Sequence, residues 1–178
     1  MADDVVALVD SSDAAYCGGV WVSDRYILTA SHCLDSEEGA LIRTHDGSHR
    51  IGWVEWIDRR RDLILLSVSN PGLHPFAVLS SGTYAGERLQ ILGHPLRKEW
   101  VTKYGKTFTH ISYRSPRDAK KMRMLLIFAD IQPGNSGGGA FDSDGKLVGI
   151  CSMRSDLYGY FVALEEIRGF LSDAGLTE

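Results

Sequence analysis

Residues 131–138 read Ile-Gln-Pro-Gly-Asn-Ser-Gly-Gly, the most informative stretch of this chain. Ser136 lies among glycines there, which suits a tight turn that pushes its hydroxyl forward, because glycine adopts backbone angles that other residues disfavour. In such a turn the backbone N–H groups of Gly134 and Ser136 can point at one spot and cradle a developing oxyanion. The stretch therefore predicts a reactive serine with an anion-stabilising site beside it.

Two segments upstream supply a base and an acid. Residues 28–33 read Leu-Thr-Ala-Ser-His-Cys, and residues 61–66 read Arg-Asp-Leu-Ile-Leu-Leu. A serine hydroxyl is a poor nucleophile until a positioned base takes its proton, and an imidazole titrates near neutral pH. We therefore expect Ser136 to act as nucleophile and His32 as base, with Asp62 fixing the imidazole tautomer. Taken alone, His32 fits a structural histidine and Asp62 a turn cap; beside Ser136, both fit a catalytic triad better.

The three motifs and two strand-like segments together resemble the chymotrypsin-like (trypsin-fold) serine proteases. Residues 17–22, Cys-Gly-Gly-Val-Trp-Val, resemble the strand before the catalytic histidine, and residues 148–152, Val-Gly-Ile-Cys-Ser, the strand that lines the primary specificity pocket. The order His, Asp, Ser is the chymotrypsin order, whereas unrelated folds with a triad use other orders. The resemblance covers about residues 5–172, and the active-site loop is most similar to bacterial, viral and high-temperature-requirement members. It implies a serine endopeptidase that cleaves polypeptide substrates through an acyl-enzyme, with Gly134 and Ser136 forming the oxyanion hole.

Short strand-like segments separated by turn residues run along most of the chain, which favours an all-β class. Residues 69–75, Ser-Asn-Pro-Gly-Leu-His-Pro, interrupt the pattern and indicate a crossing between two strand sets. The resemblance implies two six-stranded antiparallel β-barrels with the active site in the cleft between them. We place the barrel with the His and Asp motifs in residues 1–72, and the barrel with the Ser motif and the pocket in residues 73–178.

The end of the chain carries a different periodicity. Within residues 164–172, apolar side chains recur every three or four positions, at Leu164, Ile167, Phe170 and Leu171. This spacing predicts one amphipathic C-terminal α-helix.

The resemblance also implies a substrate-binding pocket. Asp130 lies where family members have the residue at the pocket base, and a buried carboxylate there would pair with Arg or Lys of the substrate. Ser152 and Gly159 match residues that line the pocket and keep it open. Arg154 departs from the glycine that is usual at the pocket mouth, and would neutralise Asp130 or attract acidic substrates. A register shift would instead leave Asp130 outside, so a preference for Arg or Lys is one of two open alternatives.

Asn135 is a second departure, with a mechanistic consequence. Trypsin-like digestive and clotting enzymes carry an aspartate just before the serine, and this aspartate pairs with a new amino terminus after zymogen cleavage. Asn135 has no charge for such a pair, and the chain has no Ile-Val-Gly-Gly start. We therefore expect activity without N-terminal cleavage.

The resemblance further implies a disulfide between Cys17 and Cys33, although in a reducing compartment both would remain buried thiols. Cys151 is expected to be a buried small hydrophobe. No Cys-x-x-Cys pair is present, and His45 and His49 lie in an expected hairpin loop, so no metal site is predicted. A triad needs neither metal nor nucleotide, and no cofactor is expected.

Composition restricts the class of protein further. Apolar residues make up 44% of the chain and charged residues 24%, as in ordinary globular proteins. No run of 18 apolar residues occurs, so no membrane-spanning helix is expected. The acidic start, Met-Ala-Asp-Asp, is not a secretory signal, and a cytoplasmic location is expected unless the chain is an excised domain.

Positive charge gathers in residues 97–123, which hold nine Lys or Arg and two acids. Such a segment can bind an anionic partner, but without a nucleic-acid motif a solvated hairpin is the simpler interpretation, and no nucleic-acid partner is expected. With Arg154, the segment motivates an alternative function, an effector protease opened by a regulatory protein partner. A non-catalytic protease-fold scaffold is a third alternative, disfavoured by the intact triad. His94, which precedes a proline, is expected in a turn.

Overall fold

The first half of the chain forms a closed antiparallel barrel of six strands in the computed structural model, which describes residues 1–114 and 120–176. Its strands follow each other around the barrel in the order β1-β2-β3-β6-β5-β4. Their bounds are β1 (Val5–Val9), β2 (Ala15–Trp21), β3 (Tyr26–Ala30), β4 (Gly39–Arg43), β5 (His49–Asp58) and β6 (Leu63–Val68).

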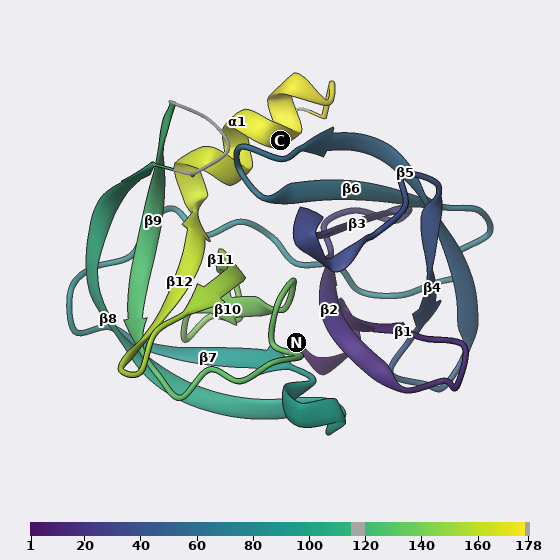
Figure 1. The fold of residues 1–178 in the computed structure, drawn as a ribbon, viewed down its shortest axis with the longest axis horizontal. Helices are drawn as coiled ribbons and strands as arrows, with labels where there is room; N and C mark the ends of the chain where they lie inside the picture. Colours follow the sequence, from purple (N-terminus) through teal and green to yellow (C-terminus); the bar gives the residue numbers. More distant parts are fainter. Residues whose placement is uncertain (115–119, 177–178) are drawn as a thin grey trace.

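A second closed barrel of six described strands has the order β10-β11-β12-β9-β8-β7. The strands are β7 (Arg88–Gly93), β8 (Val101–Arg114), β9 (Lys121–Phe128), β10 (Gly139–Phe141), β11 (Leu147–Arg154) and β12 (Tyr158–Ala163). Figure 1 shows the two barrels side by side. The prediction of an all-β fold with two six-stranded barrels is confirmed.

The three largest apolar clusters of the described residues hold this arrangement together, one inside each barrel and one drawn from both barrels. Strand β6 contributes side chains to two of these clusters. Ile64 and Leu66 point into the first barrel, whereas Leu63 and Leu65 belong to the shared cluster. Because successive strand residues point to opposite faces, a strand between two cores must be apolar at every position. This explains why residues 63–66 read as an unbroken apolar run.

The predicted C-terminal helix is confirmed as α1 (Leu164–Asp173), and its four apolar positions are buried. Phe170 and Leu171 join the shared cluster, and in Figure 1 the helix leads from the second barrel towards the first. No helix in the described ranges has the length and apolar character needed to cross a membrane.

The crossing between the barrels runs through residues 69–87, since the strands of the first end at Val68 and those of the second begin at Arg88. A domain limit at residue 72 is compatible with these bounds and stays an expectation. Residues 101–114 of the basic segment lie on β8 and residues 121–123 on β9, and Lys106, Arg114, Lys121 and Arg123 are exposed there. Residues 115–119 of this segment, as well as residues 177–178 of the second predicted unit, lie outside the described ranges.

Candidate active site

The structure brings His32, Asp62 and Ser136 into one hydrogen-bonded line between the barrels. His32 lies in a single 3-10 turn after β3 (Ser31–Cys33), Asp62 lies directly before β6, and Ser136 lies in the loop between β9 and β10. His32 Nδ1 is 2.8 Å from Asp62 Oδ2, and His32 Nε2 is 2.9 Å from Ser136 Oγ. Both distances are within the range of a proton-relaying triad.

Asp62 is surrounded by donors that favour its charged form. Its carboxylate accepts hydrogen bonds from the hydroxyls of Ser31 and Ser152, at 2.9 and 2.6 Å, and from the His32 backbone N–H at 3.0 Å. Burial by itself would raise the pKa of Asp62, but the bonds from His32 and Ser152 outweigh it and hold the pKa below its ordinary value. A proton on His32 Nδ1 satisfies an ionised Asp62, and in this tautomer Nε2 carries the lone pair that can accept the Ser136 hydroxyl proton.

Two of these partners were not foreseen in that role. The resemblance assigned Ser152 to the substrate pocket, and the structure shows in addition that its hydroxyl donates to Asp62. Ser31 was visible only as the neighbour of His32, and nothing in the local pattern links it to a residue 31 positions away. Asp62 itself has φ of 56°, a left-handed conformation that aspartate tolerates better than most residues.

The loop before Ser136 contains a turn that places backbone N–H groups beside the hydroxyl. The Asn135 N–H donates to the Gln132 carbonyl at 3.1 Å, and Gly134 has φ of 100°. Proline followed by a residue with positive φ is the signature of a type II turn. A Cβ on Gly134 would collide with the His94 carbonyl, so the position requires glycine.

The orientation of the Pro133–Gly134 peptide is fixed from outside the loop. The Leu96 N–H donates to the Pro133 carbonyl at 2.7 Å. In a trans peptide the C=O and N–H point in opposite directions, so the Gly134 N–H faces away from Leu96. Within the described ranges, no backbone hydrogen bond is donated by Gly134 or Ser136, and both N–H groups are available to an oxyanion.

Comparison with known proteins identifies this arrangement. A model of the trypsin-like peptidase domain matches residues 17–150, three quarters of the 178-residue chain. The chain belongs to the trypsin-like peptidase family. This trypsin-like peptidase is similar to the serine protease Do-like HtrA of Bacillus subtilis, with 28% identity over 140 residues, which are 72% of the chain and 30% of that protein.

A human relative has a comparable sequence identity to this chain. Serine protease HTRA4 of Homo sapiens is 26% identical over 166 residues, which are 88% of the chain and 34% of that protein. The chain thus spans about a third of the length of these curated relatives.

Solved structures agree on the fold. The Rv3671c protease in an inactive form has a TM-score of 0.85 at 19% identity, covering 97% of this chain and 89% of the other. An active form of that protease, from M. tuberculosis, has a TM-score of 0.83 at 20% identity, covering 99% and 82%. At these identities the likeness is one of fold.

Among the residues that the resemblance placed at the pocket of this trypsin-like peptidase, Asp130 does not lie as expected. The side chain of Asp130 is 69% exposed and pairs with Lys103 Nζ at 2.9 Å, instead of forming a buried pocket base. The hydrogen bond from Lys103 lowers the pKa of Asp130. Ile131, the next residue, is buried against Gly159. The alternative that leaves Asp130 outside the pocket therefore agrees with the structure.

Gly159 and Arg154 face each other across β11 and β12. Gly159 is buried, and a side chain there would collide with Ile131 and Phe161. Arg154 is exposed, and it contributes only a minor electrostatic lowering of the pKa of Asp130.

A cavity of about 420 Å³ adjoins His32 and Asp62. Its walls combine His32 and Asp62 with apolar side chains from the second barrel and two cations from the first. The lining includes Met122, Met124, Met153, Tyr113, Arg59 and Arg60.

The cysteines, His45 and His49 have structural surroundings. Cys17 and Cys33 form a disulfide, which ties β2 to the residue after His32. Cys151 is a buried thiol, and burial, with a smaller contribution from Asp62, raises its pKa to about 12. His45 and His49 pair with separate aspartates, and the described residues contain no group of three or more potential metal ligands.

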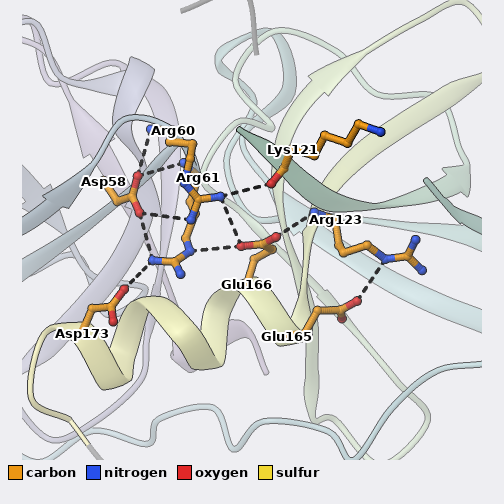
Figure 2. A network of polar contacts seen from close by, with 8 residues as sticks. All are labelled: Asp58, Arg60, Arg61, Lys121, Arg123, Glu165, Glu166 and Asp173. Carbon is orange, nitrogen blue, oxygen red and sulfur yellow. Dashed lines mark hydrogen bonds and ion pairs between the residues drawn. The ribbon is translucent and has the colours of Figure 1, made fainter. Parts of the chain in front are cut away.

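A polar network holds the loop that carries Asp62 (Figure 2). Arg61 donates to Asp58 at 2.9 Å within the loop, and to Glu166 at 3.0 Å and Asp173 at 2.6 Å on α1. Glu166 also accepts the backbone N–H of Arg123 on β9 at 2.8 Å. The network therefore joins the loop of the first barrel to the helix and a strand of the second.

Proposed function

We propose that this chain is a serine endopeptidase in which Ser136, His32 and Asp62 form the catalytic triad. The single observation that carries the proposal is the continuous line Asp62–His32–Ser136, with contacts of 2.8 and 2.9 Å, beside two available backbone N–H groups. Membership of the trypsin-like peptidase family supports the same chemistry.

In this mechanism Ser136 Oγ attacks the peptide carbonyl carbon while His32 Nε2 takes the hydroxyl proton. The N–H groups of Gly134 and Ser136 stabilise the oxyanion. His32 then gives its proton to the leaving amine as the C–N bond breaks, and an acyl-enzyme remains. Water, deprotonated by His32, attacks the acyl carbon, and collapse of the second intermediate releases the acid and restores Ser136. Asp62 keeps the imidazole in the required tautomer throughout.

The polypeptide substrate would align along β11. This strand pairs with β10 only as far as Ile150, while on its other edge it pairs with β12 to Arg154. Cys151 is still bonded on the edge that faces β10, its N–H to the Gly138 carbonyl and its carbonyl to the Gly137 N–H. The edge of β11 is therefore left uncovered by residues 137–141 only from Ser152 onward, where the Ser152 hydroxyl contacts Asp62. An extended peptide can pair with such an edge through its main chain.

We also propose that activity needs no N-terminal cleavage. The residue before the nucleophile, Asn135, is neutral and buried, so no new terminal ammonium is required to pair with it. The turn at Gly134 is instead held through the Leu96 N–H, which supports a hole that forms within the intact chain.

Selection of Arg or Lys before the scissile bond would require a carboxylate at the pocket base. Asp130 is exposed and engaged by Lys103, so we propose that it does not select the substrate. Ile131, Gly159 and Phe161 meet at the corresponding position and favour an apolar side chain of modest size.

Cleavage of a diverse peptide mixture, read by mass spectrometry, tests the proposal, with Ser136→Ala as the control. Cuts that vanish in the control, together with covalent labelling of Ser136 by a fluorophosphonate, support an active peptidase. Labelling without cuts would favour the alternative of an effector protease that needs a partner. If Ser136 is not labelled and no cuts appear, the proposal is contradicted, and a non-catalytic scaffold is favoured instead.

A further inference from the structure

His94 is completely buried, although no step of the proposed mechanism uses it. It follows β7 and precedes the 3-10 turn Pro95–Arg97. Its Nε2 lies 3.1 Å from the Val6 carbonyl on β1, and its Nδ1 lies 3.2 Å from the Trp100 backbone N–H. A carbonyl only accepts and a backbone N–H only donates, so the ring is neutral, with its proton on Nε2. The expectation of an ordinary turn did not foresee this burial.

Trp100 provides a second attachment to the same strand. Its indole N–H donates to the Val5 carbonyl at 3.3 Å, and its ring packs edge-on against the His94 ring at 4.9 Å. Residues 94–100 are therefore tied to β1 of the first barrel by two side chains, although they belong to the second half of the chain.

The tied segment holds an unfavourable backbone. Leu96, Arg97 and Trp100 have φ of 52°, 65° and 46°, and none of them is glycine. Left-handed conformations of such residues persist only where the surroundings impose them. The bonds from His94 and Trp100 to β1, the Arg97–Asp10 pair and the Leu96 N–H bond to Pro133 hold the segment in this conformation.

The same segment contacts the oxyanion turn on both sides of Gly134. The Leu96 N–H binds the Pro133 carbonyl at 2.7 Å, and the His94 N–H binds the Gly134 carbonyl at 3.2 Å. The first of these bonds fixes the peptide whose N–H is the proposed oxyanion donor. If the segment relaxed, the Pro133 carbonyl would lose its partner, and the peptide could rotate.

We propose that His94 is a positioning residue for the oxyanion hole. By accepting the Trp100 N–H and donating to Val6, its ring holds residues 96–100 in the conformation that orients the Gly134 N–H. The inference rests on the proposed peptidase activity. It predicts that loss of the Nδ1 acceptor lowers kcat with little change in KM, since only the transition state carries the oxyanion.

Two substitutions separate the roles of the ring nitrogens. In His94→Asn, the amide oxygen takes the place of Nδ1 and can accept the Trp100 N–H. In His94→Gln, the amide reaches the place of Nε2 but leaves no acceptor at Nδ1. We expect His94→Gln to lower kcat about 100-fold, as for a small misplacement of a catalytic group, and His94→Asn to retain at least about ten times more activity.

The measurements are kcat and KM per active site titrated with fluorophosphonate, and the affinity for a peptide aldehyde that forms an oxyanion on Ser136. We expect the aldehyde affinity to fall in parallel with kcat, while the affinity for an uncleaved product peptide stays the same. A purely structural role would instead lower the melting temperature and the titratable fraction without changing kcat per site.

A double variant gives an independent test of the positioning role. Arg97→Gly relieves one left-handed side chain, so adding it to His94→Gln is expected to recover part of kcat. If His94→Gln fails to fold, Trp100→Phe is the substitute variant. It removes the indole bond to Val5 and should lower kcat without raising KM.

The outcomes distinguish this inference from the proposed function. Absence of Ser136-dependent cleavage in the unaltered chain would contradict the function itself. An active chain in which His94→Gln matches the unaltered protein, or in which Asn and Gln are equally impaired, would overturn only the positioning role.

Discussion

Asp62 shows how a largely buried carboxylate can remain charged in this fold. Two hydroxyls, one backbone N–H and the His32 ring donate to it, and together they outweigh the cost of burial. The charge is useful because it selects the imidazole tautomer that can act as a base. A neutral side chain of the same shape would lack this effect.

We predict that Asp62→Asn lowers kcat about 10⁴-fold, because an amide that donates to Nδ1 selects the wrong tautomer. KM should change little, since the substrate does not contact this side chain in the proposed mechanism. Steady-state kinetics on a cleaved peptide measure both, with Asp130→Asn as a matched control at an exposed carboxylate. A loss below tenfold would remove Asp62 from the triad.

The same carboxylate should give stability a defined pH dependence. The pKa of Asp62 is lower in the folded state, so its stabilisation is present above the unfolded value of about 4 and is lost as pH falls through the folded value. The quantity to compare is the difference in free energy of unfolding between the unaltered chain and Asp62→Asn. We expect this difference to be smaller at about pH 2 than at about pH 6. Urea denaturation at both pH values measures this difference, and a constant difference would contradict it.

Asp130 and Ile131 show that neighbouring residues can exchange their expected roles. Asp130→Ser should leave the cleavage pattern and kcat/KM within about twofold of the unaltered chain, because an exposed pair with Lys103 contributes little. Ile131→Asp would be the informative counterpart, since it introduces a carboxylate against Gly159. Peptide profiling by mass spectrometry compares them, and a pattern changed by Asp130→Ser would place Asp130 in the pocket after all.

Among the structural elements, α1 has a role beyond closing the second barrel. Through Glu166 it holds Arg61, the residue next to Asp62, and Figure 2 shows the contacts converging there. Burial by itself would lower the pKa of Arg61, but Asp173 and Glu166 raise it above its ordinary value. The helix therefore stabilises the loop that presents the triad carboxylate.

Glu166→Gln should lower the free energy of unfolding by about 2 kcal/mol, less than for an isolated buried pair, because Asp58 and Asp173 still hold Arg61. Glu165→Gln is the matched control, since its pair with Arg123 is about half exposed and should contribute less than about 1 kcal/mol. Denaturant titrations of both variants measure the effects. Equal effects at the two positions would contradict a special role for Glu166.

For the whole molecule, the shared apolar cluster predicts that the two barrels unfold together. It joins residues of β1, β3 and β6 to residues of the second barrel and α1. The active site lies at this junction, so its geometry depends on the contact between the barrels.

Phe170→Ala should lower the free energy of unfolding by about 3–5 kcal/mol through the cavity it leaves, whereas Phe108→Ala, at a half-exposed position, should cost much less. Hydrogen exchange should show loss of protection in strands of both barrels, for example β6 and β12. Loss confined to the second barrel would indicate two independent units.

The amino-acid sequence alone determined the features that depend on local chemistry. Glycines around Ser136 require a turn, alternating and continuous apolar runs specify strands, and a spacing of three to four specifies the last helix. The His, Asp and Ser motifs predicted the set of three residues that the structure brings together, and the family resemblance carried by these motifs and two strand-like segments implied the two-barrel fold.

The tertiary structure decided what depends on contacts between distant segments. His94 is buried against β1, where the Val6 carbonyl, 88 residues earlier in the chain, accepts its hydrogen bond. Ser152 donates a hydrogen bond to Asp62, which lies 90 residues away in the chain. Whether Asp130 or Ile131 faces inward depends on how residues 129–133 lie against β8 and β12. Local sequence specifies the conformation of a turn or strand, but the surroundings of a side chain are fixed only when distant strands pack.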